Sequence, residues 1–319
     1  MRELAPAPTA EELLARESWP YELGPYEALG QRYCVLTDDG VLATILADIY
    51  SPLAVDHARG DAAPTDDDGL AVFRLVMPSG GRAGTAVRDD VLLGSSVEPS
   101  RLLDVLQWAI NRKVIDQAAS RRLVLHAGAV DRDGVAVLLA GHMEAGKTTL
   151  TAGLLERGYR YLTDEAVAVA PDLTVEGYAK PLSIDPGSWE VLAHLKPELR
   201  GDAAVYLERQ WLVPAHRLTA VVGSSTLAAV IVTRYVDGMP TSIERLAPST
   251  AVAMLARCTF VPDGSELTVA RVRELAALVG AVPTYQMTSG DLAEACAAVA
   301  RAMDEASDGV RDLAVSGGR

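Results

Sequence analysis

The chain has 319 residues, of which 49% are hydrophobic and 23% charged, a balance typical of a globular protein with one large or two closely associated domains. Its net charge of −14 argues against a nucleic-acid partner, because binding a phosphate backbone calls for an excess of Lys and Arg, and no dense basic run occurs. The start lacks a signal-peptide pattern and no run of about 18 apolar residues occurs, so we expect no membrane association and a cytoplasmic location.

Residues 1–119 are expected to form an N-terminal α+β region. The Pro-rich residues 1–30 predict an extended arm, and Asp38-Asp39-Gly40 predicts a hairpin turn. Strands are expected at residues 70–77 and 85–93, followed by an amphipathic helix over residues 99–118. The polar stretch 57–69 predicts a surface loop, in which Asp66, Asp67 and Asp68 form a solvated turn rather than a cation site.

A phosphate-binding loop follows the apolar strand expected at residues 135–140. The chain reads Gly-His-Met-Glu-Ala-Gly-Lys-Thr-Thr over residues 141–149, and a helical pattern continues to Gly158. Glycines permit the tight turn whose N–H groups surround phosphate oxygens, the lysine faces the β- and γ-phosphates, and the following hydroxyl is a ligand for Mg²⁺. This motif, in the context it requires, predicts ATP and Mg²⁺ as cofactors, Thr148 as a metal ligand, and nucleotide contacts from Gly141, Glu144, Ala145, Gly146, Lys147, Thr148 and Thr149.

Three further side chains are expected close to this loop. A tight turn at residues 131–134 predicts a hairpin of the strands 122–130 and 135–140, which brings His126 close to the end of the second strand. Asp164 and Glu165 end the strand after the loop helix, where an α/β nucleotide site places a magnesium ligand or a general base. From the residues alone, a core histidine and a surface acidic pair remain the alternatives.

The rest of the chain predicts more strand–helix units. Strands are expected at residues 174–179, 226–235 and 282–287, helices from 189 to about 195 and at 248–258, 266–279 and 291–303, and a flexible tail at 306–319. Lys180 and Arg234 are candidates for a second cationic contact with the transferred phosphoryl group or its acceptor, and each could equally be a surface charge. The widely spaced Cys34, Cys258 and Cys296 predict core thiols rather than a disulfide or metal site.

These elements together predict an α/β fold: a mixed central sheet with helices on its faces, and an N-terminal α+β region packed against it. The short turns around residues 122–140 and 159–179 require antiparallel strands there. We expect the catalytic domain to span residues 120–305.

From about Leu123 to Met303, the chain resembles the HPr kinase/phosphorylase-like kinases, and more closely the diverged relatives in biosynthetic clusters for ribosomally made peptides, including lasso-peptide kinases. The resemblance rests on the phosphate loop together with Leu-His-Ala-Gly-Ala-Val at 125–130, Gly-Tyr-Arg-Tyr-Leu-Thr-Asp-Glu at 158–165, Lys-Pro-Leu-Ser-Ile at 180–184 and Val-Pro-Thr-Tyr-Gln-Met at 282–287. It implies a P-loop kinase core of HPr-kinase type, in which Asp164 is the base toward a seryl hydroxyl, His126 lies at the phosphates and Glu165 helps to bind the metal.

The chain also departs from that family. It has His142-Met143-Glu144 inside the loop, Thr148 after the lysine, and an Asp-Glu pair where the bifunctional HPr enzymes usually have two Asp. These departures give no support to HPr itself as the acceptor, or to reverse phosphorolysis.

The sequence thus predicts an ATP-dependent kinase whose acceptor is a hydroxyl, namely a Ser of a peptide or protein such as a ribosomally made precursor peptide. A kinase for free serine or a sugar, and a nucleotide-dependent switch or scaffold without phosphotransfer, are the alternatives. The HPr enzymes assemble into hexamers, and the sequence here neither predicts nor excludes an oligomer.

Overall fold

The computed structural model describes residues 6–55, 69–199 and 201–316, and the chain separates into two compact units. Unit 1 comprises residues 1–117 and 183–214, and unit 2 comprises residues 118–182 and 215–319. The first division lies close to the boundary predicted at residue 119. Residues 183–214, predicted to belong to the catalytic region, instead cluster with unit 1, because η5 (Gly201–Leu207) packs on α2 (Gly40–Ile49) and Arg209 pairs with Asp104.

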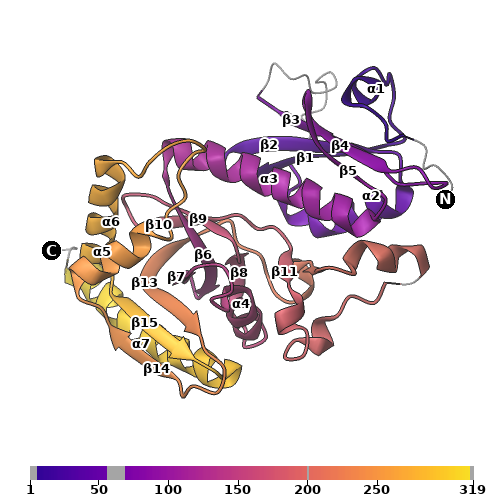
Figure 1. The fold of residues 1–319 in the computed structure, drawn as a ribbon. Helices are drawn as coiled ribbons and strands as arrows, with labels where there is room; N and C mark the ends of the chain where they lie inside the picture. The colour runs from indigo at the N-terminus through magenta and orange to yellow at the C-terminus, as the bar shows by residue number, and fades with distance from the viewer. Residues whose placement is uncertain (1–5, 56–68, 200, 317–319) are drawn as a thin grey trace. The chain divides into compact units, whose positions relative to one another are not determined.

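A five-stranded sheet forms the centre of unit 1 (Figure 1). In its order β1-β2-β3-β4-β5, β2 and β3 are parallel and all other neighbours are antiparallel. The rings of Tyr26, Tyr33, Tyr50 and Phe73 pack together in its core. Besides α2 and η5, its elements are α1 (Ala10–Leu14), β1 (Tyr21–Ala28), β2 (Gln31–Thr37), η1 (Ser51–Leu53), β3 (Ala71–Val76), β4 (Gly84–Arg88), β5 (Val91–Ser96), η3 (Pro186–Ser188), η4 (Ala193–Leu195), β12 (Trp211–Val213), and α3 (Pro99–Arg121), which continues into unit 2.

Several predictions for this region need correction. Within the arm predicted at residues 1–30, the described residues 6–30 are not simply extended, since they contain α1 and the edge strand β1. The expected hairpin turn is the start of α2, where the Asp39 carboxylate accepts a hydrogen bond of 2.7 Å from the Leu42 N–H. The strand expected at 85–93 is two strands that turn at Asp89, which has a φ of 51°. The loop predicted at 57–69 lies, apart from Gly69, outside the described residues.

A mixed sheet forms the centre of unit 2, as predicted. Its order is β10-β9-β6-β7-β13-β15-β14, with β8 beside β6, and β13 is parallel to both β7 and β15. The β6–β7 and β9–β10 pairs are antiparallel, as the short turns require. Because β10 also pairs with β13, the strands β9, β6, β7, β13 and β10 form a closed ring. The strands are β6 (Leu123–Arg132), β7 (Val135–Ala140), β8 (Arg160–Thr163), β9 (Ala166–Val169), β10 (Thr174–Gly177), β13 (Ser224–Tyr235), β14 (Ser242–Arg245) and β15 (Thr284–Ser289). The strand β11 (Leu182–Ile184) begins at residue 182, the last residue of the range 118–182 of unit 2.

Helices cover both faces of this sheet (Figure 1). The helices α5 (Pro248–Ala256) and α6 (Val269–Ala281) share an apolar core with the alternate residues Ala136, Leu138 and Ala140 of β7. The opposite face is covered by α4 (Lys147–Leu155) and α7 (Leu292–Ser316), which pack closely. There a Cβ added at Gly153 of α4 would lie 2.8 Å from Leu292 Cδ1. The mixed α/β fold with helices on both faces is therefore confirmed.

Differences in the second half of the chain are local. The helix expected from residue 189 to about 195 is only the short turns η3 and η4, and α7 continues to Ser316, through most of the predicted flexible tail. Another short turn, η6 (Ala215–Arg217), precedes β13. Cys34, Cys258 and Cys296 are buried thiols that form no disulfide within the described part of the chain, as predicted. Among the described residues, no helix has the length and apolar character needed to cross a membrane.

Candidate active site

The phosphate loop, residues 141–146, joins β7 to α4. Gly146 has a φ of 82° and Glu144 a φ of 63°, and left-handed residues at alternate positions are typical of loops whose N–H groups converge on an anion. A Cβ added at Gly146 would lie 3.2 Å from Cβ of Tyr235. Both its φ and the space around it therefore favour glycine. The Glu144 side chain is exposed, so solvent screens its negative charge.

The sheet places this loop at the carboxyl ends of parallel strands, where α/β folds bind their ligands. Ala140 at the end of β7 lies opposite Val232 of β13, and the hydroxyl of Thr233 donates to the carbonyl oxygen of Ala140 at 3.2 Å. A Cβ added at Gly141 would lie 2.8 Å from Cβ of Ala145 and 3.0 Å from Oγ1 of Thr233. The loop is thus packed tightly against the neighbouring strand.

Lys147 is the first residue of α4, and its side chain reaches back to the phosphate loop. Its Nζ donates to the carbonyl oxygens of Gly141 at 3.0 Å and His142 at 2.7 Å, and the residue is buried. Burial lowers the pKa of the ammonium, while the charge of Glu165 opposes this effect. The positive end of the α4 dipole adds to the field of the ammonium, so the loop is suited to phosphate oxygens.

Asp164 follows β8 and meets the phosphate loop, as the sequence predicts. Its carboxylate is buried, and Oδ2 accepts a hydrogen bond of 3.1 Å from the hydroxyl of Thr148 on α4. The other oxygen, Oδ1, accepts from the hydroxyl of Tyr161 at 3.0 Å and lies 2.8 Å from Nζ of Lys180. A carboxylate fixed beside the start of α4 can accept a proton from a hydroxyl held at the loop.

His126 on β6 and Glu165, between β8 and β9, lie close to each other near this carboxylate. The register pairs Ala127 with Ala140 and His126 with Ala166, so the hairpin brings His126 to the end of β7 as predicted. Its Nε2 is 3.6 Å from Oε1 of Glu165, beyond hydrogen-bond distance. Burial, and then the charge of Lys147, lower the pKa of His126 to about 4. The imidazole is therefore neutral at pH 7 and this contact is not an ion pair.

The two additional cations lie in different environments. Lys180 is buried, and its Nζ contacts Asp164 and the carbonyl oxygen of Pro181, so it is not a surface charge. Arg234 is exposed near the carboxyl end of β13 and, within the described part of the chain, its side chain has no hydrogen-bond or ion-pair partner. Tyr161 was not predicted as a site residue. The sequence feature that could have indicated it is a tyrosine in a short apolar strand, three residues before the acidic pair.

The oxygen ligands at this site fit Mg²⁺. Mg²⁺ bound with phosphates typically takes one or two protein oxygens and several waters, and the partly exposed Thr148 and Glu165 supply a hydroxyl and a carboxylate. No cluster of three or more His, Cys, Asp or Glu side chains suited to a metal occurs among the described residues. A metal here would therefore depend on phosphate oxygens as further ligands.

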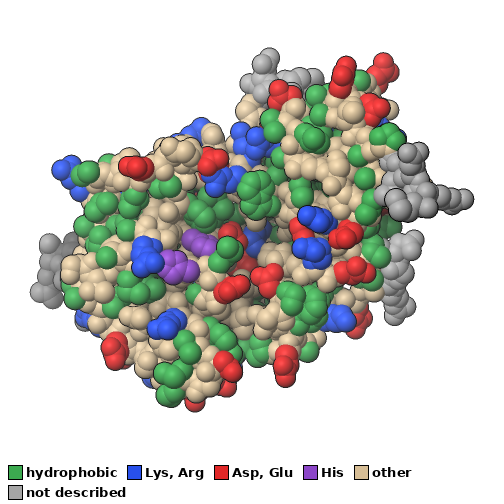
Figure 2. Space-filling model, viewed as in Figure 1, with side chains coloured by type: hydrophobic (Ala, Val, Ile, Leu, Met, Phe, Trp, Pro, Cys, Tyr) green, Lys and Arg blue, Asp and Glu red, His purple; other side chains and the backbone are tan. Residues whose placement is uncertain are grey.

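On the face in Figure 2, histidine side chains lie close together, with acidic and basic side chains nearby, over the region where Figure 1 places β6, β7 and α4.

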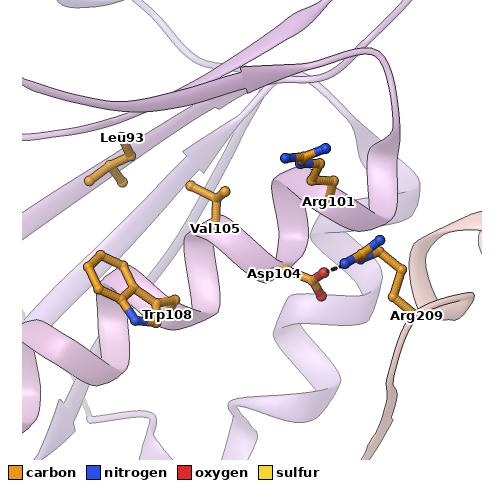
Figure 3. Close-up of a pocket in the computed structure, with 6 residues that line it drawn as sticks. All are labelled: Leu93, Arg101, Asp104, Val105, Trp108 and Arg209. Atoms are coloured by element: carbon orange, nitrogen blue, oxygen red, sulfur yellow. Dashed lines mark hydrogen bonds and ion pairs between the residues drawn. The ribbon is translucent and has the colours of Figure 1, made fainter. Parts of the chain in front are cut away.

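A separate hollow of about 290 Å³ lies in unit 1 (Figure 3). Five of its lining side chains come from β5 and α3, and Arg209 reaches it to pair with Asp104 at 2.6 Å. The lining is Leu93, Arg101, Asp104, Val105, Trp108 and Arg209. It has no nucleophile, histidine or glycine-rich turn, so it lacks the groups that the phosphate loop brings together.

Comparison with known proteins finds similarity over part of the chain. No family model matches it. The HPr kinase/phosphorylases of Neisseria meningitidis and Neisseria gonorrhoeae are each 35% identical to it over 100 residues, which is 30% of this chain and 29% of theirs. The chain thus matches less than a third of the length of these curated relatives.

A solved structure of the Hpr(Ser) kinase/phosphatase from Coxiella burnetii aligns with 57% of this chain and 98% of that chain, at 14% identity and a TM-score of 0.31. At that score the structural match carries no argument of its own. The sequence match confirms the wider resemblance, while the narrower one to lasso-peptide kinases stays a prediction. The chain that carries this phosphate loop and acid pair is therefore similar, over about a third of its length, to HPr kinase/phosphorylases.

Proposed function

We propose that this protein is an ATP-dependent kinase that transfers the γ-phosphoryl group to a hydroxyl, with a Ser of a peptide or protein as the acceptor. One observation carries the proposal: the Asp164 carboxylate is bound to the hydroxyl of Thr148 on the first turn after the phosphate loop. A base and a phosphate cradle on adjacent elements are what transfer to a hydroxyl requires.

The phosphate loop would hold the nucleotide. Its N–H groups and the ammonium of Lys147 would contact the β- and γ-phosphates, with Thr149 and the start of α4 beside them. Thr148 and Glu165 would hold Mg²⁺, which neutralises phosphate charge when bound. Asp164 would accept the proton of the acceptor hydroxyl as transfer proceeds.

Two further groups would stabilise the transferred phosphoryl. His126 is neutral at pH 7, so it can donate one N–H to a phosphate oxygen without adding a charge. Arg234 is exposed at the edge of the sheet where the loop lies, so its guanidinium can reach a phosphate or an acidic acceptor.

A protein acceptor is supported by the partial similarity to the HPr kinase/phosphorylases, whose name gives HPr as the molecule that they phosphorylate. The seryl hydroxyl is what the resemblance to this family implies. The resemblance to lasso-peptide kinases extends this proposal to ribosomally made precursor peptides. The strongly acidic chain fits a peptide better than a nucleic acid.

The test is intact-mass spectrometry after incubation with ATP, Mg²⁺ and seryl peptides encoded by neighbouring genes, with free serine and a hexose as parallel acceptors. A mass gain of one phosphoryl group on a seryl peptide is expected. Asp164→Asn should slow transfer by about 10²–10⁴-fold, the usual contribution of a positioned general base, without changing the Kd for ATP.

The outcomes separate the candidate functions. Transfer only to serine or the hexose would replace the peptide acceptor with a metabolite. Hydrolysis of ATP without transfer to any acceptor, unchanged in Asp164→Asn, would refute the kinase and favour a nucleotide-dependent switch.

A further inference from the structure

The carboxylate of Asp164 is held at both oxygens, and the two oxygens have different partners. Oδ2 meets the hydroxyl of Thr148, on the side of the phosphate loop. Oδ1 is bound by Nζ of Lys180 at 2.8 Å and by the hydroxyl of Tyr161 at 3.0 Å. The side chains of Lys180 and Asp164 are 2% and 1% exposed, so this pair lies inside the protein.

Lys180 is fixed by its backbone as well as by its side chain. It follows β10, and its N–H donates to the carbonyl oxygen of Tyr178 at 2.8 Å. Its own carbonyl oxygen accepts from the hydroxyl of Tyr161 at 2.9 Å, and its Nζ also donates to the carbonyl oxygen of Pro181 at 3.1 Å. The ammonium therefore has little freedom to leave the carboxylate.

Tyr161 links the two charged residues. Its ring is fully buried, and its hydroxyl lies within hydrogen-bond distance of both Oδ1 of Asp164 and the carbonyl oxygen of Lys180. Burial, and then the charge of Asp164, raise the pKa of this phenol well above its ordinary value, so it stays a donor. The single phenolic hydrogen can be donated to either oxygen, so the hydroxyl links the carboxylate to the lysine backbone.

We propose that Lys180 is a positioning residue: with Tyr161, it holds Oδ1 of Asp164 from the buried side, so that Oδ2 faces Thr148 and the acceptor hydroxyl. The proposal rests on the proposed kinase function. It differs from a direct contact of Lys180 with the phosphoryl group or acceptor, because the ammonium is buried and contacts Oδ1 of Asp164 and the carbonyl oxygen of Pro181.

A double-mutant cycle distinguishes the two roles. Lys180→Met keeps the length of the side chain and removes its charge, and it is made in the wild-type protein and in Asp164→Asn. If Lys180 acts through Asp164, Lys180→Met lowers kcat by about 10²-fold in the wild type, as small misplacements of a catalytic group do, and leaves KM for ATP unchanged. On the Asp164→Asn background it then changes kcat by no more than about twofold.

The cycle is repeated with the unfolding temperature. Lys180→Met removes the positive charge that pairs with the buried carboxylate of Asp164. It should therefore lower Tm more in the wild type than in Asp164→Asn, in which residue 164 carries no charge. Lys113→Met on α3 is the matched control and should alter neither kcat nor the coupling in Tm. If Lys180→Met alone does not fold, the double variant, which lacks both buried charges, is compared directly with Asp164→Asn.

Each result supports or overturns the proposal. Similar losses of kcat in both backgrounds, or a rise of KM for ATP, would overturn it and assign Lys180 to the phosphoryl group or acceptor. Coupling in Tm without any phosphoryl transfer by the wild type would refute the proposed function and reduce Lys180 to a structural partner of Asp164. If the wild type transfers the phosphoryl group but Lys180→Met lowers Tm equally in the wild type and in Asp164→Asn, the proposed role of Lys180 is refuted and the proposed kinase function is not.

Discussion

The buried histidine beside the phosphate loop predicts a specific loss of stability in mild acid. The pKa of His126 is about 4 in the folded protein, against an ordinary value of 6.5. Below pH 6.5 the unfolded chain takes up a proton at this histidine that the folded chain does not. The free energy of unfolding therefore falls as the pH drops from 6.5 toward 4, and above pH 6.5 the neutral His126 causes no such loss.

The magnitude follows from how far the pH lies below the unfolded value. At pH 5 the folded imidazole is still neutral, so the loss is about 1.5 pH units at about 1.36 kcal/mol each, or roughly 2 kcal/mol. The cause is local: the ring packs against Phe260, is 21% exposed, and lies in the field of Lys147 and Lys180, which the carboxylate of Asp164 only partly offsets.

The perturbation is His126→Gln, and the assay is denaturant unfolding at pH 7 and pH 5. Carboxylates titrate in the same range, so the informative quantity is the difference between variant and wild type. His126→Gln should lose about 2 kcal/mol less stability than the wild type over this interval. The matched control His216→Gln changes an exposed histidine and should keep the wild-type loss. An equal loss in His126→Gln and the wild type would refute a neutral, buried His126.

Two further predictions test the loop and the packing of the sheet. Lys147→Ala should abolish ATP-dependent transfer while far-UV circular dichroism and Tm stay close to the wild type, and retained turnover would contradict the phosphate-loop assignment. Gly177→Ala should reduce the free energy of unfolding by about 1–3 kcal/mol, because the added Cβ would lie 2.4 Å from the carbonyl oxygen of Leu162. That oxygen belongs to the backbone, so it cannot move away without displacing the chain. Gly187→Ala, with nothing within 4 Å, is its control in the same denaturant series, and equal stabilities would refute the predicted crowding.

The parts of the site that could be predicted from the sequence depend on short stretches of chain. The phosphate loop follows from an apolar strand, two glycines and a helix start within a few residues. The hairpin of β6 and β7 is set by a short turn, and its register fixes His126 beside the end of β7. Asp164 could be expected near the phosphate loop because it ends the strand that directly follows the loop helix. Local geometry determines each of these positions.

Tertiary structure alone decided what surrounds these residues. The sequence left Lys180 as either a surface charge or a phosphate contact, and only the tertiary structure shows that its ammonium is buried beside Asp164. Tyr161 became part of the site by the same burial. Residues 183–214 joined unit 1 through contacts such as Arg209 with Asp104. These features depend on which distant segments pack together and bury each other's side chains. The periodicity of one segment does not tell which other segment packs against it.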